Sequence, residues 1–374
     1  MNEEAVSGLD EDQMGPDNPT SPAADTAPWS ARTFGSTLNE VGWEELLAHY
    51  KEVGFLYPRK LQRLKPHLVS AAAAWERMTA AGDGLRRVYS WRSPDGQRWA
   101  HVDLWRSTET GWWVQHLVAN GGAAGARAML LASTARVIQD AWMTSCEAWF
   151  RPDNPFPNRV LGGSVPHLGA DAGRNDQDYI SLPLSASIGA HSPGMRVRET
   201  CRADADLLEL ASAARHPGFP AAVSLASDPC LAVIDRRYRL VGLRRYRRIW
   251  TVRDRRGRLL GAALAHRGPI GLNFSFLENR CDLLLASSPP DVAAEASAAV
   301  LGAAVDAYAD FLPGFMPVLV AEHEHGAPQP LITLGGQFLN RYAQVVWLTS
   351  GLPLLYTYFD TALRRPGATE AASW

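Results

Sequence analysis

The clearest pattern of apolar and polar positions runs from Gly111 to Asp140. An apolar stretch from Trp112 to Val118 has the length of one buried strand and is interrupted only by Gln115 and His116. It ends at a glycine-rich turn, after which apolar residues recur with the spacing of one helical face: Ala126, Met129, Leu130, Val137 and Ile138. The pattern therefore predicts a strand, a glycine turn and a helix.

Other elements surround this unit on both sides. The preceding residues, from Leu38 to Met78, have the spacing of two or three helices broken near Gly54 and Pro66. Pro94-Asp95-Gly96 between two alternating segments predicts a hairpin. The same kind of pattern predicts strands at 87–91 and 99–105 before the unit and a strand at 146–150 after it. A short helix that ends at Gly162-Gly163, a polar connector over 164–177 and a strand at 179–184 are predicted to follow.

The second part of the chain repeats this order of elements. A helix is predicted over 204–214, and Arg256-Gly257 lies in the turn of a second hairpin. Ser287-Ser288-Pro289-Pro290 is typical of a helix start and opens a long alanine-rich helix. The predicted strands are 249–253, 259–266, 279–286, 317–322, 343–348 and 354–359, with a short helix at 331–334.

Length and composition favour a two-domain cytoplasmic protein. A chain of 374 residues exceeds the usual size of one domain. Residues 1–33 contain almost nothing apolar, which predicts a disordered acidic tail. Four widely spaced cysteines fit a reducing compartment, and no apolar run has the length of a membrane span, so no membrane partner is expected. Nearly all basic residues are arginine, and with abundant alanine this composition is typical of a GC-rich bacterium.

Read twice, the order hairpin, strand, helix, strand, short helix and strand resembles two tandem copies of the GNAT-type N-acyltransferase fold. The resemblance is carried by VQHLVANGGAAGARAML, NPFPNRVLGG and APQPLITLGGQF. It implies an α/β protein in which each GNAT-like domain has a mixed twisted sheet flanked by helices. The implied domains are 34–185 and 195–365, joined by a linker at 186–194 and followed by a tail at 366–374.

The resemblance also implies the place of a thioester substrate, either acyl-CoA or an acyl-carrier thioester. In GNAT enzymes the acyl-CoA lies in a splay between two parallel strands, and the amides of the glycine loop bind its pyrophosphate. Free amides at a helix N-terminus suit an anion. Carried over residue by residue, the cofactor-binding positions are Asn120, Gly121, Gly122, Gly125, Ala126 and Arg127.

Two departures from the family pattern are visible. The corresponding loop of the second half, Ala286 to Pro290, has no glycine and has two prolines without N–H donors, so it is expected to hold a pyrophosphate poorly. The family's tyrosine that protonates the leaving thiolate falls near Leu161 in the first half and near Ile332 in the second. Neither side chain donates a proton.

Three residues are candidates for the general base. His116 lies on the strand that enters the glycine loop, and imidazole is the base most easily tuned to neutral pH. Glu147 lies on the strand after the loop helix, and Glu278 flanks strands of the second half; a carboxylate acts as a base if its pKa is raised. For each, the alternative is an ordinary structural role.

Glu322-His323-Glu324-His325 resembles a metal tract, but two histidines on one face do not make a site, and no metal is expected.

An arginine-rich segment leaves two interpretations open. Arginines alternate with aromatic residues at positions 236, 237, 239, 244, 245, 247 and 248. Clustered arginine with aromatics binds nucleic acid, as in aminoacyl-tRNA-dependent transferases with tandem GNAT-like folds, while a face paired with acidic residues is the other interpretation. The leading hypothesis is an acyltransferase that modifies an amine of a small molecule or peptide, with a carrier protein as a possible partner. A tRNA-dependent transferase and a non-catalytic binding protein are the alternatives.

Overall fold

The structure is a computed structural model, and it describes residues 42–81, 84–93, 95–120, 122–140, 142–185, 194–200, 202–213, 218–227, 232–311, 313–321 and 329–364. Several sequence predictions lie outside these residues: the tail 1–33, almost all of the linker, the tract 322–325, the tail 366–374 and Gly121. No helix among the described residues combines the length and the apolarity needed to cross a bilayer.

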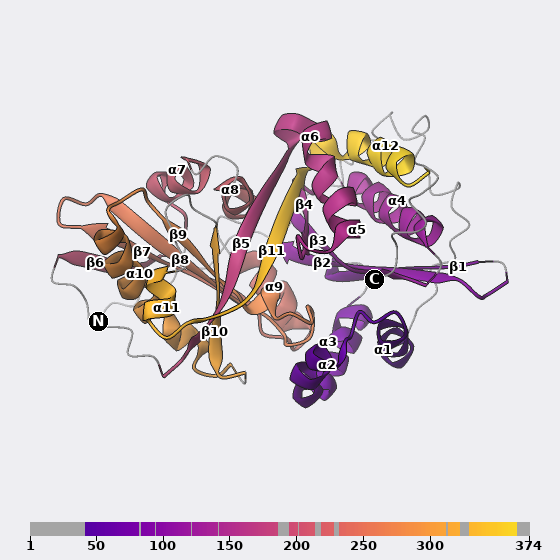
Figure 1. The fold of residues 1–374 in the computed structure, drawn as a ribbon, viewed down its shortest axis with the longest axis horizontal. Helices are drawn as coiled ribbons and strands as arrows, with labels where there is room; N and C mark the ends of the chain where they lie inside the picture. The colour runs from indigo at the N-terminus through magenta and orange to yellow at the C-terminus, as the bar shows by residue number, and fades with distance from the viewer. Residues whose placement is uncertain are drawn as a thin grey trace, which may run out of the picture.

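The N-terminal half, defined as residues 42–185, begins with helices and continues with strands. Helices α1, α2 and α3 precede the β1–β2 hairpin, and β3, α4 and β4 follow it (Figure 1). The predicted strand–turn–helix unit is confirmed as β3 and α4. The bounds are α1 Trp43–Glu52, α2 Pro58–Leu64, α3 Leu68–Ala80, β1 Arg86–Arg92, β2 Trp99–Thr108, β3 Gly111–Ala119, α4 Ala123–Gln139, β4 Ser145–Phe150, α5 Pro155–Val160, α6 Val165–Leu168 and β5 Ala172–Pro183.

The C-terminal half, defined as residues 194–364, repeats this order with a second hairpin and a second strand–helix–strand unit. Its β7–β8 hairpin is followed by β9, α10 and β10. The bounds are β6 Met195–Thr200, α7 Ala205–Ala213, α8 Gly218–Ser227, α9 Ala232–Leu240, β7 Tyr246–Asp254, β8 Leu259–Arg267, β9 Cys281–Leu285, α10 Pro290–Ala304, β10 Phe315–Ala321, α11 Gln329–Thr333, β11 Gln337–Leu348 and α12 Leu352–Ala362.

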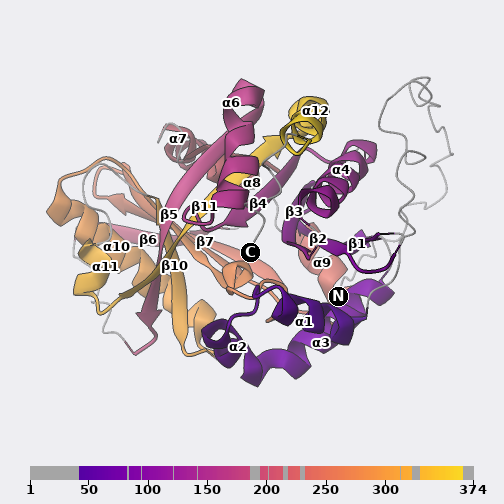
Figure 2. The same ribbon diagram turned by 45° about the vertical axis from the view of Figure 1, so that its right-hand side comes forward.

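A mixed α/β fold is confirmed, but the strands of both halves form one continuous sheet. Its order is β1-β2-β3-β4-β11-β5-β10-β9-β8-β7-β6. Strand β11 of the C-terminal half lies between β4 and β5, and β5 of the N-terminal half pairs with β10. Each half therefore contributes its last strand to the other. The long strands β5 and β11 cross the middle of the molecule in Figures 1 and 2.

Helices cover both faces of this sheet. In the N-terminal half, α4 packs on β1, β2 and β3, and α12 packs on α4. The opposite face carries the aromatic core beneath α1 and α3, which includes Trp75, Trp105 and Trp113. Helix α12, the last helix that the structure describes, lies beside α4 (Figure 2) and completes the core around it.

Two sequence predictions of local structure are wrong. Residues 354–359 form part of helix α12, because Leu352, Leu355 and Phe359 share one buried helical face and Pro353 occupies the first turn. The polar connector predicted over 164–177 contains α6 and the first half of β5. Two of its polar residues, Asn175 and Gln177, are buried where β5 pairs with β11.

Candidate functional site

Strands β3 and β4 diverge after a short parallel ladder. The pairing runs from Gly111 and Ser145 to Val114 and Ala148, where it ends. Just beyond this point β3 contains a bulge: the register with β2 shifts, and His116 has a φ of 52°. A bulge bends a strand and increases its twist. We call the region beyond Val114 and Ala148 the strand divergence. It has the parallel geometry that the resemblance implies for the thioester.

The glycine turn connects the end of β3 to α4. Asn120 fixes its start, because its Oδ1 accepts a hydrogen bond from the Trp99 backbone N–H at 2.7 Å. Gly122 is the N-cap residue of α4 and has a φ of 76°, which glycine adopts without strain. The first N–H groups of α4 lack partners within the helix and carry the positive end of its dipole. The turn therefore presents an anion-binding geometry beside the strand divergence.

The remaining predicted cradle residues hold α4 in place. A Cβ on Gly125 would lie 2.8 Å from the Ala100 Cβ, so this glycine allows close packing of the helix on the sheet. Ala126 is fully buried in the same contact. Arg127 forms an ion pair with Asp360 of α12. A role of these residues in ligand binding stays a prediction.

His116 is enclosed by aromatic rings. Its ring stacks on Phe274, with centroids 4.4 Å apart, and its Nδ1 is 3.8 Å from Asp103 Oδ2. Burial, followed by the positive charges of Lys60 and Arg86, holds the pKa of His116 well below its usual value. Within the described residues neither ring nitrogen has a hydrogen-bond partner. His116 is thus a neutral imidazole at the strand divergence.

The two halves meet beside His116 through a loop of the C-terminal half. The Gln115 side chain donates to the Leu272 carbonyl at 2.6 Å and accepts from Asn273 Nδ2 at 3.2 Å. The two Gln115 contacts fix β3 against the loop that precedes β9. On the neighbouring strand β2, the buried Asp103 carboxylate accepts a hydrogen bond from Arg86 Nε at 2.9 Å.

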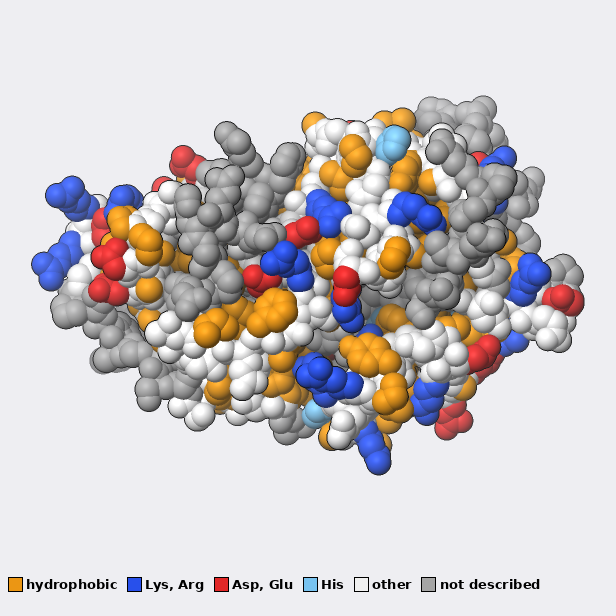
Figure 3. All heavy atoms as spheres, viewed as in Figure 1, with side chains coloured by type: hydrophobic (Ala, Val, Ile, Leu, Met, Phe, Trp, Pro, Cys, Tyr) orange, Lys and Arg blue, Asp and Glu red, His pale blue; other side chains and the backbone are white. Residues whose placement is uncertain are grey.

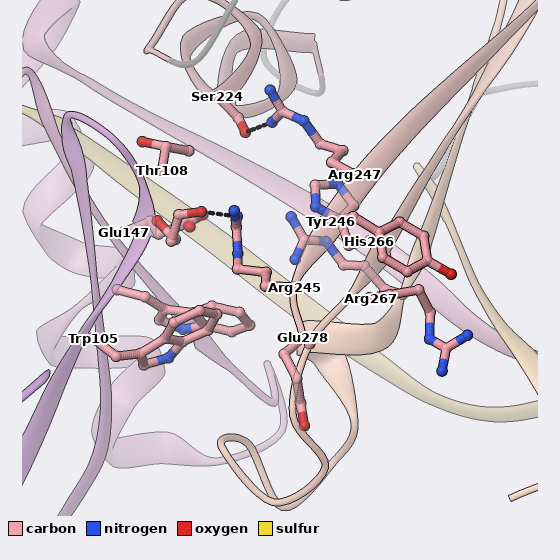
Figure 4. Close-up of a pocket in the computed structure, with 14 residues that line it drawn as sticks. Trp105, Thr108, Glu147, Ser224, Arg245, Tyr246, Arg247, His266, Arg267 and Glu278 are labelled. Atoms are coloured by element: carbon pink, nitrogen blue, oxygen red, sulfur yellow. Dashed lines mark hydrogen bonds between the residues drawn. The ribbon is translucent and has the colours of Figure 1, made fainter. Parts of the chain in front are cut away.

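Glu147 and Glu278 line a small cavity between the halves. Glu147 lies on β4 and accepts a hydrogen bond from Gln344 Nε2 at 2.6 Å. Glu278 lies in the turn before β9, and its Oε1 accepts from the Gly271 N–H at 3.3 Å. Burial raises the pKa of Glu278 to about 8. Figure 4 shows Arg245 between the two glutamates.

This cavity is small and rich in cations. It has room for about one water molecule. Arg247, Arg280 and His266 also line it, whereas His116 does not. The structure therefore brings Glu147 and Glu278 together and places His116 apart, at the strand divergence. Among the described residues no group of three or more His, Cys, Asp or Glu side chains is arranged to hold a metal ion.

One functional candidate was not identified from the sequence. Lys60 of α2 is half-buried, and its ammonium lies 3.9 Å from the centroid of the Phe55 ring. Burial and the nearby Arg151 lower the pKa of Lys60 to about 7. The available signal was composition: Lys60 is one of three lysines in a chain whose other basic residues are all arginine or histidine.

The structure also places the residues that depart from the family pattern. Leu161 follows α5 and is buried, and Ile332 lies in α11 with 40% of its surface exposed. Neither position offers a proton donor. Helix α10 begins at Pro290 with Pro289 as its N-cap. The turn before α10 therefore lacks amide donors that the glycine turn before α4 has.

The arginine-rich segment is largely engaged within the chain. Arg245 is buried and binds the Ser107 carbonyl and Asp235, Arg247 binds Ser224, and Arg244 pairs with Asp310. On the face drawn in Figure 3, basic side chains near the middle of the molecule also lie beside acidic ones. Outside the arginine-rich segment, strands β5 and β11 also carry ion pairs, Arg174–Asp176 and Arg341–Asp178. The contacts agree with a face paired with acidic residues.

Comparisons with known proteins found similar structures but no similar sequence. No family model matches the chain, and no curated protein matches it. A putative acetyltransferase from Pyrococcus horikoshii is similar over 84% of this chain and 89% of its own, at 10% identity and a TM-score of 0.42. A GCN5-related N-acetyltransferase-like protein from Streptococcus suis is similar over 82% of this chain and 100% of its own, at 10% identity and a TM-score of 0.39.

A tandem GNAT protein from the clavulanic acid biosynthesis pathway is similar over 74% of this chain and 88% of its own, at 13% identity and a TM-score of 0.34. All three TM-scores are below 0.5, so the functional proposal rests on the strands and residues of this chain. In each half a hairpin is followed by a strand, a crossover helix and a parallel strand, which is the GNAT-type order of elements.

Proposed function

We propose that the protein is an acyltransferase that moves an acyl group from a thioester donor, acyl-CoA or acyl carrier protein, to an amine of a small molecule or peptide. One observation carries the proposal: β3 and β4 stop pairing at Val114 and Ala148, toward the end of β3 from which the chain enters the N-terminus of α4. A thioester chain laid in the strand divergence places its phosphates at the amides after Gly122.

The chemistry expected there is mainly positioning and hydrogen bonding. A backbone amide of β3 beyond the end of its ladder with β4 stabilises the oxyanion that forms when an amine attacks the thioester carbonyl. Holding the amine and the thioester together converts a bimolecular reaction into an effectively unimolecular one. The N-terminal half holds the donor in this proposal, because the turn of the C-terminal half has two prolines in place of amide donors.

A charge placed at the start of α4 tests the donor site. Ala124 is the second residue of α4 and is exposed. In Ala124→Glu the carboxylate favours the helix dipole, so the fold is kept, but it repels a pyrophosphate bound to the same amides. We expect calorimetry to show acetyl-CoA binding at least tenfold weaker than in the wild type, with an unchanged melting temperature.

Ala124→Gln is the matched control, because it has the same size without the charge, and it should bind acetyl-CoA like the wild type. Equal binding by both variants, or no binding by the wild type, would remove the donor site from the proposal.

A non-catalytic acyl-CoA-binding protein is the second candidate, because Leu161 stands where the family has its tyrosine. It predicts the same binding result without release of CoA in the presence of amines.

A further inference from the structure

Lys60 lies one aromatic ring away from His116 of the strand divergence. Its ammonium contacts the Phe55 ring, and that ring in turn contacts the His116 ring with centroids 5.6 Å apart. Lys60 is close enough to His116 to lower its pKa, and Arg151 is close enough to Lys60 to lower the pKa of the lysine. His116 lies two residues after Val114, the last residue of β3 that pairs with β4, and Arg151 follows the end of β4. The ammonium is therefore near the end of the β3–β4 ladder, one aromatic ring away from His116.

The charged and titratable groups around Lys60 come from several elements. His116 faces it from β3, and Arg151 from the segment after β4. Arg151 forms an ion pair with Asp153, and Tyr57 at the start of α2 and Tyr342 of β11 also influence it. Burial and the Arg151 guanidinium together disfavour a positive charge on Lys60.

Acyl transfer at this position needs a proton carrier that neighbouring groups do not provide. An ammonium acceptor must lose a proton before it attacks, and the leaving thiolate must gain one. Burial raises the pKa of Tyr342, and the pKa of His116 is well below neutral. Arginine stays protonated, so Arg151 exchanges no proton at neutral pH. With a pKa of about 7, Lys60 exists in both forms at physiological pH, which suits proton transfer.

We propose that Lys60 is the residue that carries protons between the acceptor amine and the leaving thiolate. Neutral Lys60 takes a proton from the acceptor ammonium, R–NH₃⁺. The free amine attacks the thioester carbonyl carbon, the N–C bond forms and the C–S bond breaks. The Lys60 ammonium gives its proton to the thiolate sulfur, and the second amine proton leaves to water. The products are the amide, the thiol, one released proton and neutral Lys60. This role depends on the proposed acyltransferase function.

Nuclear magnetic resonance tests the state of Lys60 without an acceptor. Protein labelled with [ε-¹³C]lysine has only Lys51, Lys60 and Lys65 to resolve, and Lys51 and Lys65 are exposed internal controls. Lys60 should titrate near pH 7, well below the value of about 10.4 for a lysine in a model peptide. Addition of acetyl-CoA should shift the Lys60 signal alone. Titration of Lys60 at the model-peptide value, or an unchanged Lys60 signal when calorimetry shows bound acetyl-CoA, would overturn the assignment.

Acetylation of Lys60 itself locates the thioester. In acetyl-CoA without any added amine, a neutral lysine next to the thioester carbonyl reacts slowly as a substitute acceptor. Mass spectrometry should find Lys60 acetylated at least tenfold faster than Lys51 and Lys65, and Ala124→Glu should abolish this preference. Equal rates at the three lysines in the wild type would contradict the role of Lys60.

The same experiment separates this inference from the proposed function. A preference for Lys60 that persists in Ala124→Glu would count against donor binding at α4. Conversely, donor binding that Ala124→Glu weakens, without any preference for Lys60, leaves the acyltransferase proposal in place and removes Lys60 from it. Lys60→Met should bind acetyl-CoA within twofold of the wild type, because the donor phosphates are held by α4. A larger loss would make Lys60 a binding residue and overturn its assignment as a proton carrier.

Discussion

Two carboxyl groups only a few residues apart are held in opposite protonation states by their neighbours. Asp282 is half-buried, yet Arg280 at 2.9 Å and His266 at 3.1 Å outweigh the cost of burial and lower its pKa. Within the described residues Glu278 forms no ion pair, and its Oε2 has no hydrogen-bond partner. Burial therefore raises the pKa of Glu278 to about 8, and the group is mostly neutral at pH 7.

Glu278 should make the protein less stable as the pH rises. The unfolded carboxyl loses its proton near 4.5, whereas the folded one keeps it up to about 8. Between these values the folded state binds more protons, so the free energy of unfolding falls with rising pH. In Glu278→Gln this fall is absent, and at pH 8 the variant should be more stable than the wild type by roughly 1–3 kcal/mol.

Urea unfolding at several pH values from 5 to 8 measures this difference, with Glu44→Gln on the exposed side of α1 as the control. Parallel pH curves for wild type and Glu278→Gln would show that Glu278 is ionised in the folded protein.

At the residue scale, side-chain chemistry could be predicted but not its environment. His116, Glu147 and Glu278 were selected because their residue types act as bases, and the structure places two of them at one cavity. The sequence does not reveal Lys60, because its pKa depends on burial and on Arg151, which is far from it in sequence. Such contacts leave no local pattern.

At the scale of elements, helix α12 shows that the spacing of apolar residues does not always decide between a helix and a strand. Leu352, Leu355 and Phe359 have helical spacing, but the run from Leu354 to Phe359 contains β-prone aromatic residues and was interpreted as a strand. The predicted strand–turn–helix unit and both hairpins are confirmed, since their apolar periods and turn residues are local signals.

Helix α12 should stabilise the N-terminal half through its buried face. Phe359 is 1% exposed and packs in the core around α4, so Phe359→Ala should cost about 3–5 kcal/mol. Leu354 on the same helix is 58% exposed, and Leu354→Ala should change stability by less than about 0.5 kcal/mol. Denaturant unfolding of both variants measures the contrast. Similar losses would mean that α12 does not pack on α4 through this face.

Strand β5 could not be predicted in full because its polar residues pair across the molecule. Asp178 binds Arg341 at 2.9 Å, and Gln177 lies 3.4 Å from Gln344. All of these partners belong to β11, which lies more than one domain's length away in sequence. A polar segment therefore has the appearance of a connector until its partner strand is known.

At the scale of the whole molecule, the exchange of last strands joins the halves. Val345 of β11 is fully buried in the core around α4, although the other strands of its half lie on the other side of β5. The sequence predicted two sheets side by side, since repeated elements reveal a duplication but not which copy receives each strand. The predicted domain boundaries themselves stay a prediction.

The exchange should make unfolding a single event. We expect scanning calorimetry to give one transition for the wild type. Val345→Ala should shift that whole transition to lower temperature, because neither half keeps its core without β11. Two separate transitions, with only one of them moved by Val345→Ala, would show that the halves unfold independently.

The same exchange sets a delay during synthesis. When Pro183 has left the ribosome, the edge of β4 has no strand beside it, and it stays uncovered until Gln337 to Leu348 have been made. At ordinary rates of translation this takes on the order of 10 s. An open apolar edge of that lifetime invites pairing with other nascent chains. The cell must therefore shield the growing protein, or synthesise few copies at a time, until its last strand has been made.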